Sequence, residues 1–401
     1  MQNSLKFIKS KNYPQNPVVT ILIPTLNEKI SIKKFLDWCH QGISKIKYST
    51  EIIIVDSSDD GTDKIALKNY ASVVKTKKNG LGQAYIDGMS FARGKYILMG
   101  DADCTYDFRE IKTFIEKFDL GYEFIMGSRF KGRIQTGAMP FLHRYFGTPI
   151  TTLIFNIIFR TNFSDIHCGM RGITKDALLK MNLESQSWQY ASEMILKSVH
   201  MELKSIEVPI NFFKDLKGRQ SHMIREGFLE PWKAGWQNIC AMLIYGSDFF
   251  FLKPGFLIFS FSGFFIFLLK DGMIVINDSL TLSIYSMLCF VTLSICGLVM
   301  LYTGILCKII FDYNKKFEQK ILSIISINKS TILLLIFLTI GLYNSFPIIN
   351  YFLENNYQLT GINDKLIFNT VFGLYIGTIG ILGYGMILII NAVINTTKFR
   401  K

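Results

Sequence analysis

Residues 95–103 read KYILMGDAD, and this stretch decides the fold. The first five residues form a short apolar run that is typical of a buried strand, and Gly100 ends it. Asp101 and Asp103 follow directly, separated only by Ala102. On an extended segment this spacing lets two carboxylates reach one hard cation. The stretch therefore predicts a buried strand that ends in a Mg²⁺ or Mn²⁺ site.

Three similar apolar runs lie elsewhere in the first half of the chain, at residues 18–23, 51–55 and 123–126. Helical patterns alternate with them, at residues 30–46, 62–70, 82–92 and 108–118. This alternation predicts an α/β domain with a mostly parallel sheet and helices on both faces. Ligands bind such sheets outside the carboxyl ends of the strands.

Polar clusters follow these predicted strands. Residues 25–28 read TLNE, residues 56–62 read DSSDDGT, and the pair Asp101 and Asp103 comes third. One such cluster is ordinarily a solvated loop, but three at one sheet edge in a basic protein indicate a binding site. The glycine-rich stretch 79–84, NGLGQA, opens a predicted helix, and two interpretations stay open: a phosphate site at the helix N-terminus or a simple turn.

The second half of the chain predicts a membrane domain. Overall, 49% of the residues are hydrophobic and only 19% are charged, which is too apolar for most soluble enzymes of this size. Four apolar runs are long enough to span a bilayer, at residues 249–269, 280–307, 331–352 and 366–394. We expect a domain at 1–227, an interfacial helix at 228–248, for which a packed domain helix is the alternative, and an all-α four-span domain at 249–401.

Lysine and arginine predict the orientation. The link between the second and third spans is rich in lysine, and the C-terminal tail is basic, so both are expected in the cytoplasm together with the N-terminal domain. Seven cysteines without a CxxC pair suit a reducing compartment, and no secretory signal is evident. The net charge of +13 suits an anionic membrane or substrate; its concentration beside the predicted spans argues against nucleic acid.

Taken together, these residues resemble glycosyltransferase family 2, in particular the polyprenyl-phosphate glycosyltransferases similar to dolichyl-phosphate mannose synthase. The resemblance covers about residues 17–225. Its motifs are PTLNE at 24–28, the acidic loop 56–62, GLGQA at 80–84 with Gly88, DAD at 101–103, GSRF at 127–130, Asp165 with CGMR at 168–171, and VPI at 208–210.

The resemblance implies a GT-A-type nucleotide-sugar-binding domain in the cytoplasmic (inner) membrane, facing the cytoplasm. It implies transfer of a hexose from a nucleoside-diphosphate sugar, with UDP or GDP, to a polyprenyl phosphate. Asp101 and Asp103 are expected to hold the metal, with Arg129, Asp165 and Arg171 as further catalytic residues. The nucleotide sugar is expected to contact Pro24, Leu26, Glu28, Ile54, Asp56, Ala102 and Lys214.

The chain departs from the family pattern at three places. Asp56 follows Val55 where many members have paired aspartates, and Thr105 stands where some supply a glutamine metal ligand. The closing basic loop reads here as residues 214–222, with its register open. An amino-sugar transferase acting on the same lipid and a non-catalytic membrane scaffold remain alternatives, and a homo-oligomer is left open.

A lipid phosphate would be the attacking group, and it is already anionic near neutral pH. No strongly perturbed general base is then required. We expect basic residues to gather the two anionic reactants. Residues 140–159, PFLHRYFGTPITTLIFNIIF, are unusually apolar for a soluble surface, and either contact the bilayer or belong to the core.

Overall fold

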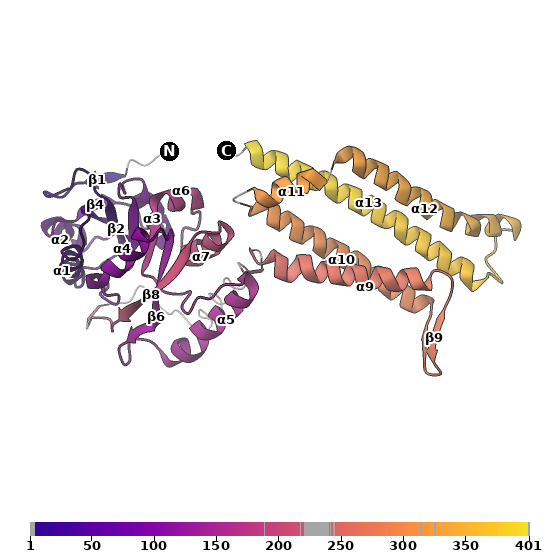
Figure 1. The fold of residues 1–401 in the computed structure, drawn as a ribbon, viewed down its shortest axis with the longest axis horizontal. Coiled ribbons are helices and arrows are strands. Elements are labelled where there is room, and N and C mark those ends of the chain that lie inside the picture. The colour runs from indigo at the N-terminus through magenta and orange to yellow at the C-terminus, as the bar shows by residue number, and fades with distance from the viewer. Residues whose placement is uncertain are drawn as a thin grey trace. The chain divides into compact units, whose positions relative to one another are not determined.

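A computed structural model describes residues 5–399, apart from residues 188, 217, 220–239, 241, 244, 313–314 and 325. The chain divides into two compact units, Met1–Met242 and Leu243–Lys401 (Figure 1). The first unit is α/β and the second consists mainly of apolar helices, which confirms the predicted fold class. Residues 228–239, 241 and 244 of the expected interfacial helix lie outside the described residues, so that helix and its boundaries stay predictions.

The first unit is built on an eight-stranded sheet with the order β1-β4-β3-β2-β5-β7-β6-β8. Only β1 and β7 run against the other strands, so the prediction of a mostly parallel sheet is confirmed. The strands are β1 (Lys6–Ile8), β2 (Val19–Thr25), β3 (Thr50–Asp56), β4 (Ser72–Lys75), β5 (Tyr96–Met99), β6 (Phe124–Ile134), β7 (Arg171–Thr174) and β8 (Ser205–Phe212).

Register brings the predicted polar clusters to one edge of this sheet. In the central parallel pair, Thr25 of β2 lies opposite Asp56 of β3. On the other side of β2, Leu22 pairs with Met99, the last residue of β5. Because parallel strands end at a common edge, the loops that follow β2, β3 and β5 are neighbours. The sequence alone predicts this meeting, since each loop follows an apolar strand.

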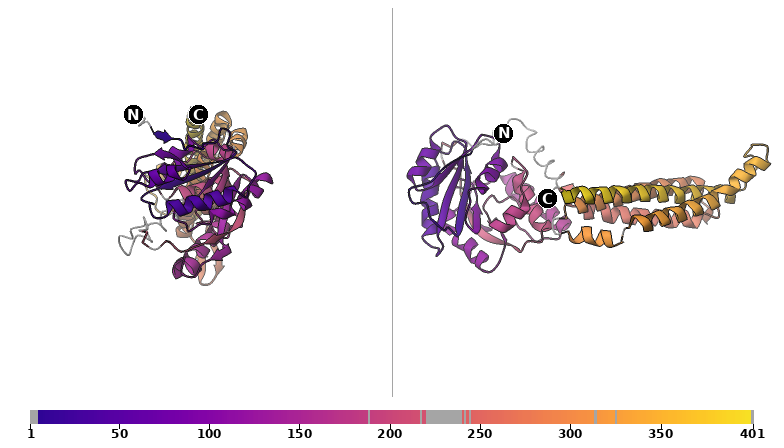
Figure 2. Two further views of the ribbon diagram at one scale, coloured as in Figure 1. Left: turned by 90° about the vertical axis from the view of Figure 1, so that its left-hand side faces the viewer. Right: turned by 90° about the horizontal axis from the view of Figure 1, so that it is seen from above.

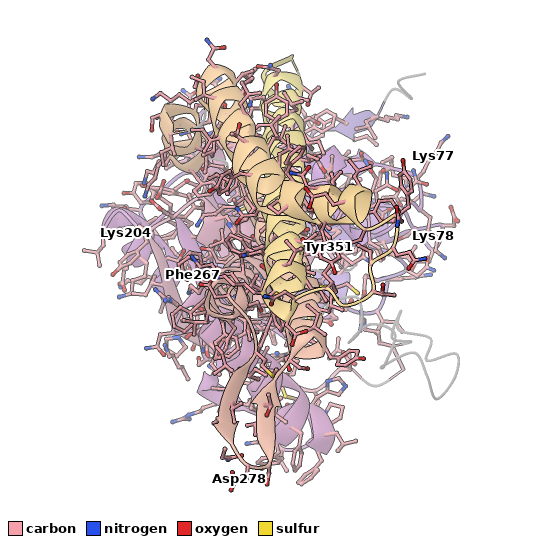
Figure 3. The ribbon with its side chains drawn as sticks, turned by 90° about the vertical axis from the view of Figure 1, so that its right-hand side faces the viewer. Lys77, Lys78, Lys204, Phe267, Asp278 and Tyr351 are labelled. Atoms are coloured by element: carbon pink, nitrogen blue, oxygen red, sulfur yellow. The ribbon has the colours of Figure 1, made fainter. Side chains whose placement is uncertain are left out.

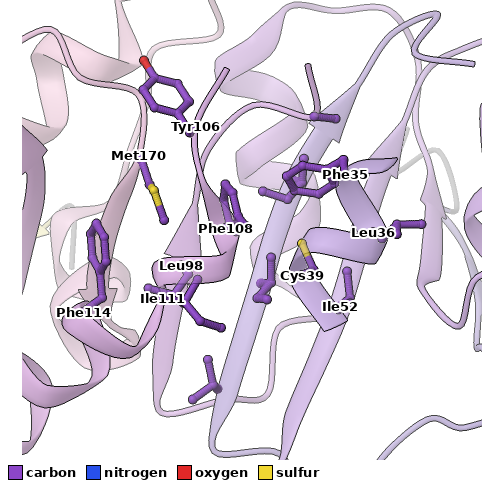
Figure 4. Packing of buried hydrophobic residues seen from close by; sticks show 14 of the residues in the cluster. Phe35, Leu36, Cys39, Ile52, Leu98, Tyr106, Phe108, Ile111, Phe114 and Met170 are labelled. Atoms are coloured by element: carbon purple, nitrogen blue, oxygen red, sulfur yellow. The ribbon is translucent and has the colours of Figure 1, made fainter. Parts of the chain in front are cut away.

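Helices cover both faces of the sheet. Alternate residues of β2 and β3, such as Ile21 and Ile52, share one core with α1 and the segment around α4 (Figure 4). On the opposite face, Gly88 of α3 lies so close to Leu22 and Val55 that a Cβ there would clash. The helices are α1 (Ile32–Ile43), α2 (Thr62–Lys68), α3 (Leu81–Met89), η1 (Phe108–Glu110), α4 (Lys112–Asp119), η2 (His143–Gly147), α5 (Thr148–Phe159), α6 (Lys175–Met181) and α7 (Tyr190–His200).

The second unit contains four helices that are long and apolar enough to cross a membrane, at Asp248–Leu269, Ile284–Ile310, Ile327–Glu354 and Asp364–Thr396. Each overlaps one predicted run, although helices two to four extend further at one or both ends. The elements are η3 (Asp248–Leu252), α9 (Lys253–Leu269), α10 (Ile284–Ile310), α11 (Lys316–Ile324), α12 (Ile327–Glu354) and α13 (Asp364–Phe399) (Figure 2).

An unpredicted hairpin joins the first two of these helices. It consists of β9 (Ile274–Asn277) and β10 (Leu280–Leu282), and Asp278 lies at its turn (Figure 3). Ile274 and Leu282 pack toward the helices, while Val275 and Ile276 are exposed. Residues 280–282 were expected to begin the second span, because this stretch is as apolar as the span that follows it.

Glycines allow the apolar helices to approach closely. A Cβ on Gly297 of α10 would lie 2.6 Å from the backbone nitrogen of Phe259 and 3.0 Å from the carbonyl oxygen of Gly255, both in α9. Small residues at such crossings are common in membrane helices because packing, rather than water exclusion, holds them together. A buried hydrogen bond of 2.7 Å between Ser294 and Tyr375 also ties α10 to α13.

We predict that Gly297→Leu destabilises the helical unit, because its side chain would meet the backbone of α9. Overpacking of this kind costs about 1–3 kcal/mol. Thermal denaturation of the full chain in detergent should show a lower Tm. Gly385→Leu is the matched control, since nothing lies within 4 Å of a Cβ at that position. Equal Tm values for the two variants would contradict the packing described.

Candidate active site

Asp56 lies at the sheet edge and is held by three protein donors. Its fully buried carboxylate accepts hydrogen bonds from the hydroxyls of Thr25 (2.7 Å) and Ser58 (2.6 Å) and from Lys75 Nζ (2.8 Å). Lys75 also lies 3.2 Å from a carboxylate oxygen of Asp63. Asp56 therefore fixes the loop after β3, and its predicted contact with a nucleotide remains a prediction.

The other residues assigned to the nucleotide lie in and around the same edge. Pro24 is part of β2, and Leu26 follows that strand. Ile54 is fully buried in the core, where it pairs with Ile23. Ala102 is 2% exposed between the two aspartates of the DAD stretch. Their roles toward a ligand stay predictions.

Asp101 and Asp103 concentrate negative charge at the end of β5. Burial, and next the charge of Asp103, raise the pKa of Asp101 to about 7. Burial also raises the pKa of Asp103, although Thr105 opposes this by donating its backbone N–H (2.9 Å) and hydroxyl (2.6 Å) to Oδ1. A desolvated pair of carboxylates is expensive for the fold and is typical of a site that receives a cation.

The donor set fits a divalent cation. Within the described residues no group of three or more His, Cys, Asp or Glu side chains gathers, and Asp101 and Asp103 are the two carboxylates that follow β5. Mg²⁺ is commonly held by one or two carboxylates together with substrate phosphates and water. Gly169 keeps the site open, since a Cβ there would lie 2.9 Å from Asp101 Oδ2. Asp101 and Asp103 can therefore hold the predicted Mg²⁺ or Mn²⁺.

Among the described residues of the basic loop, Arg219 reaches these carboxylates. Its Nε donates to Glu28 Oε2 over 2.8 Å, its Nη2 pairs with Oε1 of the same residue, and Nη1 lies 3.5 Å from Asp103 Oδ2. Lys214, predicted for this role, is exposed and packs beside the turn at Gly137. Lys217, Ser221 and His222 lie outside the described residues. The register of the loop thus favours Arg219.

Arg129 and Asp165 form a buried two-point ion pair. Arg129 Nε and Nη2 donate to the two carboxylate oxygens of Asp165 over 2.7 and 2.8 Å, and the backbone N–H of Arg129 adds a third bond of 3.1 Å. Asp165 is fully buried. Two parallel hydrogen bonds of this kind both stabilise a guanidinium and determine its orientation. Asp165 therefore orients Arg129.

Glu207, which was not predicted from the sequence, in turn positions Asp165. Its Oε1 accepts the backbone N–H groups of Ser164 (2.8 Å) and Asp165 (3.0 Å), and its Oε2 accepts Lys131 Nζ over 2.8 Å. A glutamate directly before the VPI motif, on a strand of alternating pattern, is the only signal that could have pointed to it. Lys75 carries even less signal, because it ends a short strand that was not predicted.

Arg171 is 1% exposed and donates to the carbonyls of Cys168 (2.9 Å), Ala191 (2.6 Å) and Ile166 (3.4 Å). These bonds hold the loop 165–171 against α7 and beside Asp101. The structure thus places Gly169 of this loop beside Asp101, with the charge of Arg171 close enough to oppose the rise that burial causes in the pKa of that aspartate. A direct contact of Arg171 with an anionic substrate stays a prediction.

The glycine-rich stretch serves backbone packing. A Cβ on Gly80 would lie 2.4 Å from the carbonyl oxygen of Gln186, and one on Gly82 would lie 2.0 Å from that of Ser185. The backbone N–H of Gln83 donates to the same Gln186 carbonyl over 2.9 Å. Of the two interpretations of this motif, the geometry favours the turn, packed closely against residues 185–186, because the carbonyl of Gln186 already lies at the helix N-terminus.

We predict that Asp165→Asn destabilises the first unit. Breaking a buried ion pair by removing one charge costs about 3–5 kcal/mol, because Arg129 would stay buried without its counter-charge. Thermal unfolding of the full chain should show a lower first transition. The control is Asp37→Asn, at an exposed position of α1. An unchanged transition would show that the pair does not hold this region together.

Part of the chain is similar to known proteins. Residues 20–181 match the family described as Glycosyl transferase family 2. The low-salt glycan biosynthesis hexosyltransferase Agl6 of Haloferax volcanii is 35% identical over 243 residues, which are 60% of this chain and 56% of that protein. The chain thus spans little more than half of this relative's length.

Two further proteins show more distant similarity. A dolichyl-phosphate beta-glucosyltransferase of Dictyostelium discoideum is 27% identical over 231 residues, covering 51% of this chain and 69% of that protein. The crystal structure of mannosyl-3-phosphoglycerate synthase from Rubrobacter xylanophilus covers 57% of this chain and 74% of its own, with a TM-score of 0.44 and 19% identity.

The family match contains the DAD stretch, Arg129, Asp165 and Arg171, and so includes the residues that meet at the sheet edge. The N-terminal unit of this chain accordingly contains a glycosyltransferase family 2 domain.

Proposed function

We propose that this protein transfers a hexose from a nucleoside-diphosphate sugar to a polyprenyl phosphate at a membrane, with a divalent metal. The observation that carries the proposal is that the loop 165–171 lies beside Asp101 at Gly169 and holds Arg129 through Asp165, in a chain that also has four helices apolar enough to span a bilayer. The hexosyltransferase and the dolichyl-phosphate glucosyltransferase among its relatives support both halves of the proposal.

The donor would bind over the ends of β2, β3 and β5. Glu28, Asp56 and the backbone near Pro24, Leu26 and Ile54 would receive the base and ribose of UDP or GDP. Asp101 and Asp103 would hold the metal, which offsets the charge that develops on the departing diphosphate. The guanidinium of Arg219 would turn from Glu28 and Asp103 to the diphosphate, because a phosphate offers it the same two-point contact.

The acceptor would enter beside Arg129. The recorded hydrogen bonds of Arg129 use its backbone N–H, Nε and Nη2, so that in the described part of the chain Nη1 remains to meet a phosphate oxygen. Asp165 keeps this guanidinium from rotating away. The attacking phosphate oxygen carries its charge already, so the site needs a fixed cation there more than a general base.

The helix α5 would lie against the bilayer. Several of its apolar side chains are exposed, among them Ile150 (50%), Leu153 (58%) and Ile157 (56%). The preceding turn adds Phe141, Leu142, Tyr145 and Phe146, also exposed. A contiguous apolar surface with basic neighbours such as Arg144 is typical of a helix that rests in the interface of a membrane.

The direct test is an assay of the full chain in lipid vesicles that contain polyprenyl phosphate. A panel of radiolabelled UDP- and GDP-sugars is supplied with Mg²⁺ or Mn²⁺, and the lipid product is separated by thin-layer chromatography. We expect label in the lipid fraction with a hexose donor. Transfer only from an amino-sugar donor would favour that alternative, and no transfer from any donor would contradict the proposal.

We predict that Asp103→Asn lowers transfer by about 10²-fold or more, because the metal loses a charged ligand and the diphosphate loses its counter-charge. Excess chelator should have the same effect on the wild-type protein, and added Mn²⁺ should reverse it. Asp119→Asn, a surface carboxylate at the end of α4, is the control. Full activity of Asp103→Asn in chelator-treated vesicles would rule out the assigned metal site.

We predict that the N-terminal domain and the C-terminal tail both face the cytoplasm. The basic segment that joins the second and third helices contains Lys315, Lys316 and Lys320, and the adjoining helix ends add Lys308 of α10 and Lys329 of α12. A reporter fused after Lys401 should report the cytoplasm, whereas the same reporter inserted near residue 357 should report the opposite side. The reverse pattern would overturn this orientation.

A further inference from the structure

The helix α5 has two distinct faces. Its outer face is the exposed apolar surface described above, whereas Thr148 (4%), Thr152 (4%) and Phe155 (1%) are buried against the domain. Thr151 lies between these faces and is partly buried. Thr151 can therefore connect the outer face of α5, which would meet lipid, with residues on the inner side of the helix.

Thr151 makes such a contact with His167. The distance from Thr151 Oγ1 to His167 Nε2 is 2.9 Å, and the same hydroxyl lies 2.7 Å from the carbonyl oxygen of Gly147. A hydroxyl has one proton, and the carbonyl can only accept it, so the hydroxyl accepts from His167 Nε2–H. Burial lowers the pKa of His167 to about 4, which keeps the ring neutral at physiological pH.

His167 also contacts the ion pair. Its backbone N–H donates to Asp165 Oδ1 over 3.3 Å, and that oxygen receives Nη2 of Arg129. One residue thus bonds to α5 through its ring and to the carboxylate that orients Arg129 through its backbone. The sequence of contacts runs from α5 through Thr151, His167 and Asp165 to the guanidinium.

We propose that the Thr151–His167 hydrogen bond positions Arg129 when α5 rests on lipid, so that the anion-binding end of the site is set by contact with the membrane. Both are positioning residues, since neither reaches the reacting atoms itself. The proposal rests on the proposed function for its substrate. Small displacements of a binding group matter here, because productive attack needs aligned reactants.

Variants at both positions can distinguish the effect of losing this hydrogen bond from the effect of altered packing. Thr151→Val and His167→Leu remove it, whereas Thr151→Ser and His167→Gln keep an acceptor and a donor, respectively. The matched control is Thr152→Val on the same helix, because the Thr152 hydroxyl is buried without a hydrogen-bond partner in the described part of the chain. All variants are made in the full chain and reconstituted in vesicles with polyprenyl phosphate.

We expect Thr151→Val and His167→Leu each to raise the apparent KM for the lipid acceptor by about threefold to tenfold, the range that one hydrogen bond supports. The apparent KM for the nucleotide sugar should not change. The effects of the two should not add in the double variant, and Thr151→Ser, His167→Gln and Thr152→Val should resemble the wild type. Additive effects, or equal changes for donor and acceptor, would overturn the proposal.

A second measurement does not depend on transfer. Hydrogen–deuterium exchange of the protein in lipid nanodiscs should be faster at the amides of Ser164, Asp165 and His167 in Thr151→Val than in the wild type or Thr152→Val. Unchanged exchange would contradict the link even if activity fell. A wild-type protein that transfers no sugar, yet shows the expected exchange, would contradict the proposed function and leave the link between α5 and Asp165 supported.

Discussion

The rest of the site depends on one electrostatic constraint: parallel strands deliver several carboxylates to the same sheet edge, and each must be neutralised. Lys75 forms an ion pair with Asp56, and Arg129 forms one with Asp165. Arg219 binds Glu28 closely but reaches Asp103 only at 3.5 Å, and Asp101 keeps a pKa raised to about 7. The carboxylates of the DAD stretch are therefore the ones at this edge that lack a full counter-charge. A bound cation would neutralise the DAD carboxylates, and the negative charge of a diphosphate would pair with Arg219.

Much of this arrangement could be predicted from the sequence, because the information is local. Each of the strands that end at Thr25, Asp56 and Met99 is an apolar run followed by a polar cluster, and parallel pairing is enough to bring the clusters together. Glu207 and Lys75 could not be predicted in the same way. Their importance depends on which backbone groups and carboxylates tertiary folding places beside them, and their strands are short or partly polar. The glycines at 80 and 82 likewise look like a phosphate loop until the carbonyls of residues 185 and 186 are seen against them.

The helical unit obeys a different constraint. Four apolar runs predict four membrane helices by length alone, and the helices observed agree. The contacts between these helices could not be predicted from the sequence. Lipid tails are as apolar as leucine side chains, so hydrophobicity does not determine which helices pack together. Close approach at Gly297 and the Ser294–Tyr375 hydrogen bond supply that selection. The hairpin of β9 and β10 was missed for a related reason: an apolar strand beside a span has the same composition as the span.

We propose that Asp101 and Asp103, which follow β5, bind a divalent metal together with a nucleoside diphosphate. Electron paramagnetic resonance of Mn²⁺ titrated into the full-length protein tests it most directly, with and without UDP or GDP. We expect weak Mn²⁺ binding to the protein alone and markedly tighter binding when the matching nucleotide is present, because the diphosphate completes the ligand set and pairs with Arg219. Mn²⁺ binding that neither nucleotide changes, or that survives the loss of both Asp101 and Asp103, would contradict it.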